Sequence, residues 1–235
     1  MNAKLRRFRS AQKLGTGLVV LLGLNLVLAA VMVVLRLSEV GLLQRIGRGE
    51  FVSPGEAARS DQRVDTITIV GLVVLGVTGI VWLVWQHRSQ ANLHAAQVRE
   101  LKYTPGWAVG WWLIPFGNFV KPFQTVRELW KASGGDPDWR QVDTWPLIGW
   151  WWAGWIVMAI LERVAARSII EDQPTLDGLI LGSRVFLASE VVTIVTGTFA
   201  IMIVRSVIER QDGMLARRVE GEVAPPRPDV PSHPS

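Results

Sequence analysis

The chain has 235 residues, of which 49% are hydrophobic and 19% charged, with a net charge of +5 and no cysteine. The missing cysteine excludes disulfides, thiolate metal sites and cysteine nucleophiles. The apolar residues are concentrated in blocks of about 20, the length that a helix needs to cross about 30 Å of hydrocarbon. We therefore expect an all-α polytopic membrane protein. In such a protein positive charge reports loop placement and anionic lipid, so nucleic-acid binding is not expected.

The first predicted span covers residues 17–37 and is apolar apart from Asn25 and Arg36. A basic arm, residues 1–16, precedes it. A cleaved signal peptide is the alternative, but this apolar run exceeds the core of about 7–15 residues that signal peptides have. No clear small-x-small cleavage site follows it, so we favour a retained span.

Three further apolar blocks predict spans at 64–86, 144–163 and 179–204. The connecting segments are then an outer loop at 38–63, a long segment at 87–143 and a second outer loop at 164–178. The tail, 205–235, is expected to be disordered from about residue 220, where it becomes rich in proline.

Lysine and arginine are more numerous in the arm, the 87–143 segment and the tail than in each of the two remaining loops. By the positive-inside rule this predicts four spans in the cell membrane with both termini in the cytosol. A fifth span at 107–123 is the alternative. Pro115, Asn118, Lys121 and Pro122 argue against it.

All twelve tryptophans fall between Trp82 and Trp155, and four of them lie in the central element, 107–131. Trp107 to Phe116 would reach only about 15 Å as a helix, half a membrane, so it should lie flat, re-enter or be buried. Tryptophan favours the wet edge of the bilayer. We expect a half-membrane or interfacial helical element between the second and third spans.

A second piece of this element is expected to start at Asn118 as helix cap, with Pro122 in the first turn. One face then carries apolar side chains for lipid: Phe119, Phe123, Val126 and Trp130. The other face is charged, with Lys121, Arg127 and Glu128 among its residues. This pattern predicts an amphipathic interfacial helix beside anionic headgroups.

The same residues resemble a bacterial membrane family, domain of unknown function 4328. The similarity spans roughly 64–204 and rests on these motifs: Arg88 with Asn92-Leu93, Tyr103-Thr-Pro-Gly-Trp-Ala-Val-Gly-Trp-Trp-Leu-Ile-Pro-Phe-Gly-Asn118, Lys121-Pro-Phe-Gln124 and Glu128-Leu-Trp130. The family often has Ala-Asn after Ile-Pro, where this chain has Phe116-Gly-Asn118. The resemblance implies a multi-span bacterial membrane protein and brings no activity or cofactor.

Three sets of polar or aromatic residues are candidate sites. The interface or lipid-binding set is Trp107, Trp111, Trp112, Pro115, Asn118, Lys121, Pro122, Arg127 and Trp130. Two polar residues fall inside spans, Asn25 and Glu190, and a loop anion site could use Arg88 and Asn92. Asn25 is expected to bond Thr193 or Thr196, and Glu190 to pair with Arg36 or Arg184 unless it carries protons. Gly149 with Ala153 predicts a close helix approach.

No catalytic motif, cofactor fingerprint or metal site is expected, since His87 and His94 lack a third ligand nearby. The leading hypothesis is a non-enzymatic membrane component that binds lipid or an unidentified protein partner through the 107–131 element. The alternative is a small transporter or channel component that uses Glu190. A homodimer would then be needed, because four helices leave little room for a pathway.

Overall fold

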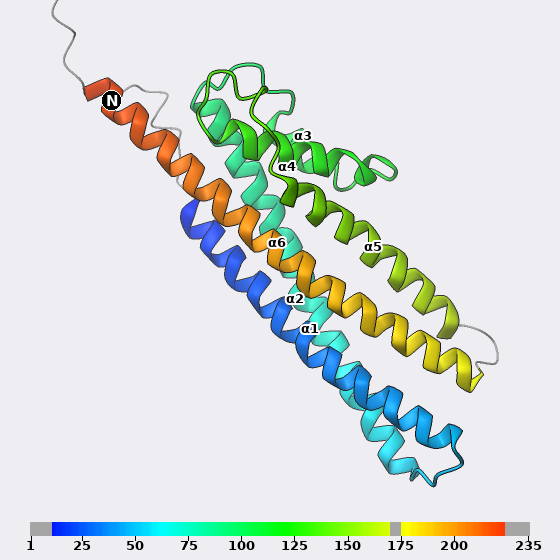
Figure 1. The fold of residues 1–235 in the computed structure, drawn as a ribbon. Helices are drawn as coiled ribbons and strands as arrows, with labels where there is room; N and C mark the ends of the chain where they lie inside the picture. The colour runs from blue at the N-terminus through cyan, green and yellow to red at the C-terminus, as the bar shows by residue number, and fades with distance from the viewer. Residues whose placement is uncertain (1–10, 170–174, 224–235) are drawn as a thin grey trace, which may run out of the picture.

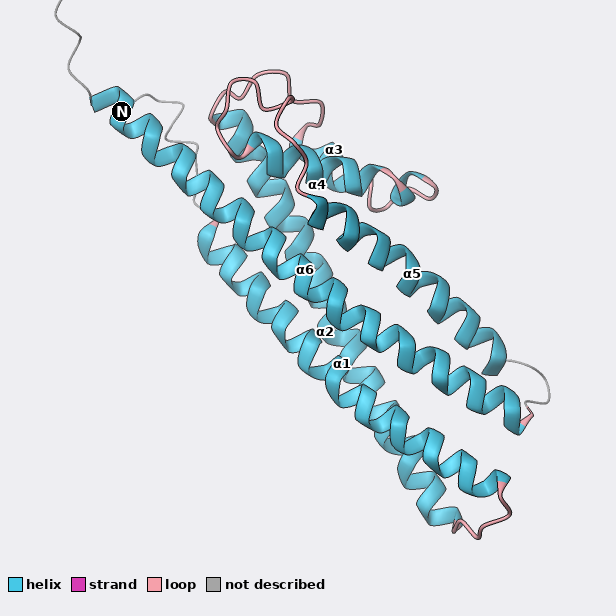
Figure 2. Ribbon diagram, viewed as in Figure 1, coloured by secondary structure: helices cyan, strands magenta, loops and turns pink. Residues whose placement is uncertain are grey.

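The computed structural model describes residues 11–169 and 175–223, and over these ranges it is all-helical, without strands (Figures 1 and 2). The elements are α1 (Gln12–Gly47), α2 (Pro54–Ala95), α3 (Pro105–Gly110), the 3₁₀ turn η2 (Gly117–Phe119), α4 (Lys121–Ala132), α5 (Pro146–Ile169) and α6 (Leu176–Val223). The expected fold class is confirmed.

Four helices are long and apolar enough to cross a membrane: α1, α2, α5 and α6. Each corresponds to one predicted span, so the chain is a multi-span membrane protein. α3 has only six residues. Within the described ranges there is accordingly no fifth span at 107–123.

The helices run well beyond the predicted spans. The predicted outer loop 38–63 is mostly helical, because α1 continues to Gly47 and α2 begins at Pro54. Ser53 caps α2 by accepting a hydrogen bond from the Glu56 backbone nitrogen at 3.2 Å. At the other end α6 continues to Val223, so the prediction of disorder from residue 220 is wrong for 220–223. The arm 1–10 and the tail 224–235 lie outside the described residues.

Helix packing follows a simple order, with α2 against α1, α1 against α6 and α6 against α5. The outer faces of these helices remain apolar and uncovered: Leu72 and Val73 on α2, for example, are each 63% exposed. Exposed apolar faces of this length are typical of helices that lie against lipid. The packing therefore agrees with membrane insertion.

The segment between α2 and α5, residues 96–145, folds over one end of the bundle, and we call it the head (Figure 1). The best-buried part of the core lies here, where Trp85 and Leu93 of α2 meet Leu129 of α4 and Val207 of α6. The head is thus fixed to the bundle by packing from several helices.

Candidate interfacial site in the tryptophan-rich head

The head begins with a short helix that its own sequence defines. Thr104 caps α3 by accepting from the Trp107 backbone nitrogen at 3.3 Å, and Pro105 occupies the first turn. A turn after α3 leads to Phe116, whose φ of 63° is unusual for a bulky residue. That backbone bend leaves the Phe116 ring 87% exposed.

Two details of the predicted element are wrong. The run Trp107 to Phe116 is not one half-membrane helix, because α3 ends at Gly110 and a turn follows. Asn118 does not cap α4, since η2 intervenes and Val120 stands at the cap position without a side-chain bond. Pro122 does lie in the first turn of α4, as expected.

Apolar side chains gather where α3, η2 and α4 meet, and we call this group the apolar tip. Each member is more than 50% exposed: Trp107, Leu113, Phe116, Phe119 and Val120. The hairpin of α3 and α4 reaches sideways from the bundle end, beside the start of α5 (Figure 1). Leaving such a cluster in water costs about 25 cal/mol per Å² of apolar surface, so a lipid or protein covering is favoured.

Cations stand directly behind the tip. The Lys121 ammonium lies 5.3 Å from the centre of the Trp111 ring, and the Arg127 guanidinium 5.4 Å from that of Phe123. Arg127 also lines an open cavity of about 510 Å³. Its other walls are Lys102, Tyr103, Gln124, Glu128, Lys131, Trp139, Arg140 and Thr144. The arrangement joins an apolar surface to a cationic one.

Two predicted site residues serve a different purpose. Trp112 donates from Nε1 to Gln86 Oε1 at 2.9 Å and packs edge-on against Trp152 and Trp155. Trp130 donates to Ser206 Oγ at 2.9 Å and is only 8% exposed. Both anchor the head on the bundle. Of the other predicted residues, Trp107, Pro115 and Arg127 are exposed, and Trp111 and Lys121 are partly exposed.

The predicted lipid-facing stripe of α4 is also wrong in part. Val126 is fully buried, and so is most of Trp130, because α4 packs on α2, α5 and α6 rather than on the bilayer. Glu128, expected on the charged face, is 6% exposed. The predicted division of α4 into an apolar face and a charged face is therefore only partly correct.

Glu128 is the centre of a buried polar network. Its carboxylate accepts hydrogen bonds from the backbone nitrogens of Lys102 (2.8 Å) and Tyr103 (3.1 Å), and from Gln90 Nε2 (3.0 Å). Tyr103 in turn donates its hydroxyl to Gln124 at 2.7 Å. Burial, followed by the nearby charge of Glu128, raises the pKa of Tyr103 above its usual range. This network fastens the start of the head to α2 and α4.

A second network contains the predicted loop residue Asn92. Its Nδ2 donates to Gln211 Oε1 at 3.2 Å, and Gln211 Nε2 donates to the carbonyl of Ser89 and to Ser133 Oγ. Asn92 is 2% exposed, whereas Arg88 on the same helix is partly exposed. The two residues therefore do not come together as a surface anion site.

Inside the bundle, Asn25 forms the kind of interhelical bond that was expected, but with another partner. Its Nδ2 donates to Thr78 Oγ1 of α2 at 2.8 Å and to the Leu21 carbonyl at 2.8 Å. Thr193 instead bonds the Ser189 carbonyl on its own helix at 2.9 Å. Asn25 thus joins α1 to α2 rather than to α6.

Glu190 lies partly buried on α6, within electrostatic range of Arg36 and Glu162. Arg36, one expected partner, pairs with Glu39 at 2.7 Å. Among the described residues Glu190 itself has neither a hydrogen bond nor an ion pair. The predicted structural pairing of Glu190 is therefore not formed.

Two buried amides of α2 were not predicted from the sequence: Gln90, which bonds Glu128, and Gln86, which bonds Trp112 and Thr125. Gln86 and Gln90 lie four residues apart on α2 and are fully buried. Their spacing, directly after a tryptophan-ended apolar run, places both amides on one helix face and could have predicted a polar partner. In the part of the chain that the structure describes, no group of three His, Cys, Asp or Glu is placed to hold a metal.

Comparison with known protein families gives one match, the domain of unknown function DUF4328, over residues 48–209. The matched region runs from the start of α2 through the head to α6. No curated protein and no solved structure matches the chain.

Proposed function

Because the chain belongs to the DUF4328 family, whose function is unknown, we propose that it is a non-enzymatic membrane component that binds anionic lipid through its head. The observation that carries this proposal is the apolar tip with Lys121 and Arg127 directly behind it. An interfacial protein surface needs both parts, an apolar face for the acyl boundary and cations for phosphate.

The proposal includes an orientation, with the head and both termini on the cytosolic side of the cell membrane. The tryptophans favour a position of the head at the membrane–water interface. Trp82, Trp151 and Trp155 lie where α2 and α5 meet the head, and tryptophan is enriched at this boundary. The chain has no native cysteine, so a single cysteine at the exposed Asp138 is a clean probe. A water-soluble maleimide should reach it only from the cytosol.

Substitution of Lys121 and Arg127 tests the lipid proposal. We expect Lys121→Gln with Arg127→Gln to weaken phosphatidylglycerol binding by roughly 30-fold, since each basic residue near a membrane contributes about 1 kcal/mol. Native mass spectrometry of the purified protein, titrated with phosphatidylglycerol or phosphatidylcholine, measures this. Phosphatidylcholine binding should change little.

The matched control is Arg163→Gln with Arg167→Gln, which removes the same charge from exposed positions at the other end of α5. Equal losses in both double variants would mean that only net charge matters, and the proposal would be abandoned. A protein partner is the other occupant considered for the tip. It would protect a spin label at Phe116→Cys from both oxygen and an aqueous nickel complex, whereas lipid protects it from the nickel complex alone.

The unpaired state of Glu190 favours a second candidate, a small transporter or channel component working as a homodimer. A carboxylate inside a span is costly unless it has a task or a partner. This candidate predicts that Glu190→Gln abolishes a proton- or ion-linked flux in proteoliposomes, while Glu190→Asp retains part of it. Unchanged flux in Glu190→Gln would remove the candidate.

A further inference from the structure

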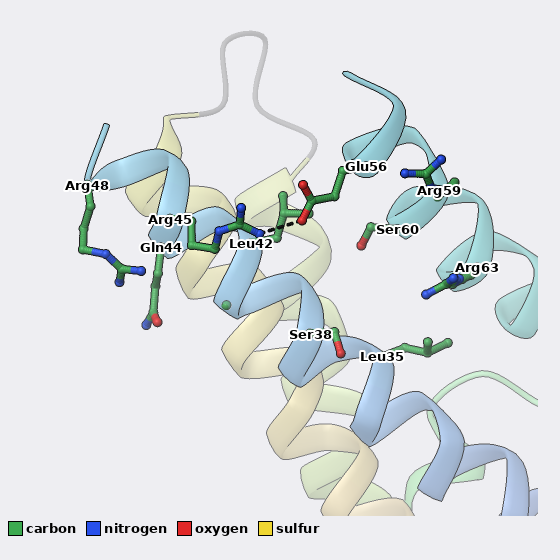
Figure 3. A pocket seen from close by; sticks show the side chains of 11 residues that line it. Leu35, Ser38, Leu42, Gln44, Arg45, Arg48, Glu56, Arg59, Ser60 and Arg63 are labelled. Carbon is green, nitrogen blue, oxygen red and sulfur yellow. Dashed lines mark hydrogen bonds and ion pairs between the residues drawn. The ribbon is translucent and has the colours of Figure 1, made fainter. Parts of the chain in front are cut away.

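At the bundle end remote from the head, the last turns of α1 and the first turns of α2 enclose an open cavity of about 610 Å³ (Figure 3). This size is ordinary for a small-molecule site. The walls are Leu35, Ser38, Gly41, Leu42, Gln44, Arg45, Arg48, Glu56, Arg59, Ser60 and Arg63. They include four arginines and a single acid, so the cavity is strongly cationic.

Two of the arginines are already neutralised. Arg45 pairs with Glu56 at 2.6 Å and with Glu50 at 3.3 Å, and Arg48 pairs with Glu50 at 2.7 Å. These pairs lower the pKa of Glu50, with Arg48 the larger cause. The ion pairs hold the α1 side of the cavity in place. Glu56, the single acid in the cavity wall, is thereby already paired with Arg45.

Arg59 and Arg63 on α2 form no ion pair with any described residue. They are four residues apart, so they share one helix face about 6 Å apart along the axis and repel each other. Asp61 between them points to the opposite side of the helix, since two residues correspond to about 200°. In Figure 3 both guanidinium groups extend from α2 on the side of the cavity. An anion placed there would relieve their repulsion.

The cavity wall changes along α1 from the apolar Leu35 to the charged Arg48, thirteen residues or about 20 Å further on. Leu42 and the Ser38 and Ser60 hydroxyls lie between these extremes. A cavity that carries both apolar and cationic side chains suits a headgroup at the membrane–water boundary. Hydroxyls at that depth add neutral donors for oxygen acceptors.

We infer that this cavity binds a phosphate group through Arg59 and Arg63. A guanidinium presents a planar fork that engages two oxygens, and one fork already occupies both oxygens of a carboxylate. A phosphate has further oxygens and can accept both forks at once. The phosphate could belong to a lipid headgroup or to a free soluble anion. The inference does not depend on the function proposed for the head, which uses other residues at the other end of the bundle.

The test measures binding of two probes to the full-length protein, phosphatidic acid in nanodiscs and inorganic phosphate in solution. We expect Arg59→Gln with Arg63→Gln to weaken binding at least tenfold in one arm. Loss in the phosphatidic acid arm identifies a lipid source, and loss in the inorganic phosphate arm a soluble one. Binding unchanged in both arms overturns the inference.

The matched control is again Arg163→Gln with Arg167→Gln, an exposed pair also four residues apart and at the same end of the bundle, but not among the residues that line this cavity. It should bind both probes like the unmodified protein, and an equal loss there overturns the inference. Arg59→Lys with Arg63→Lys keeps the charge and removes the fork, so it should show an intermediate loss and remains informative if the glutamine pair fails to fold. The Lys121 and Arg127 double variant should bind inorganic phosphate normally, whereas its anionic-lipid binding at the head is weakened, which separates this site from the head.

Discussion

Replacement of Glu128 by alanine is expected to lower the free energy of unfolding by about 3 kcal/mol or more, since each buried donor left without a partner costs about 1–3 kcal/mol. The carboxylate is 6% exposed and accepts three hydrogen bonds, two of them from the Lys102 and Tyr103 backbone nitrogens. After truncation these donors are buried and unsatisfied, and water reaches them poorly. Denaturant unfolding in mixed micelles, followed by tryptophan fluorescence of the head, measures the loss.

Glu209→Ala is the control, because Glu209 is exposed on α6 and should change stability by no more than about 0.5 kcal/mol. Glu128→Gln should fall between the two variants. Tyr103 is the only tyrosine, so ultraviolet titration reports on it alone. In Glu128→Gln its pKa should move down toward the usual value of about 10 while burial keeps it raised. A Glu128→Ala protein as stable as Glu209→Ala would contradict the network.

The four spans were predictable because a membrane helix obeys constraints that act within its own residues. Length and hydropathy located α1, α2, α5 and α6. The extensions beyond the bilayer were not predictable in the same way. Residues 54–63 are polar, and residues 38–47 mix polar with apolar side chains, so both were predicted as loop. They are helical because 38–47 continues α1 and because Ser53 caps α2. Hydropathy describes whether a side chain prefers apolar or aqueous surroundings, and it does not report whether the backbone is helical.

The head was predicted as an aromatic element, but its packing was not. An apolar stripe on α4 could face lipid or protein, and only the fold decides between them. Here α2 and α6 supply the buried partners for Val126 and Trp130. Glu128 is buried because Gln90, 38 residues earlier in the chain, meets it. Such distant pairings leave no periodic signal in the sequence.

The close helix approach predicted at Gly149 and Ala153 is a third example. Gly149 is exposed, and a Cβ atom added there would meet no atom within 4 Å. The close approach of α5 and α6 lies at Gly154 instead, opposite Thr196. Ala153 and Gly154 are neighbours in sequence and point about 100° apart on the helix. The spacing of small residues alone therefore cannot identify which of them faces the next helix.

Gly154→Leu is therefore expected to lower the free energy of unfolding by about 3 kcal/mol, the upper end of overpacking effects. A Cβ atom at Gly154 would overlap Thr196 Oγ1 and lie 3.3 Å from the Thr196 Cβ atom. Thr196 is 5% exposed, so it has no free space to move into. Because α5 packs chiefly on α6, the clash should separate α5 from the rest of the bundle. Unfolding in mixed micelles measures the effect.

Matched alanine variants give opposite signs at the two glycines of α5. Gly154→Ala should destabilise by about 1–3 kcal/mol, whereas Gly149→Ala should be neutral or stabilising, since alanine favours helix by about 1 kcal/mol over glycine. Truncation of the opposing side chain, Thr196, is the decisive experiment. Thr196→Ala combined with Gly154→Ala should recover most of the loss, because the two changes act on one contact and are not additive. If the losses at Gly149 and Gly154 are equal and Thr196→Ala restores nothing, α5 and α6 do not approach each other at this point.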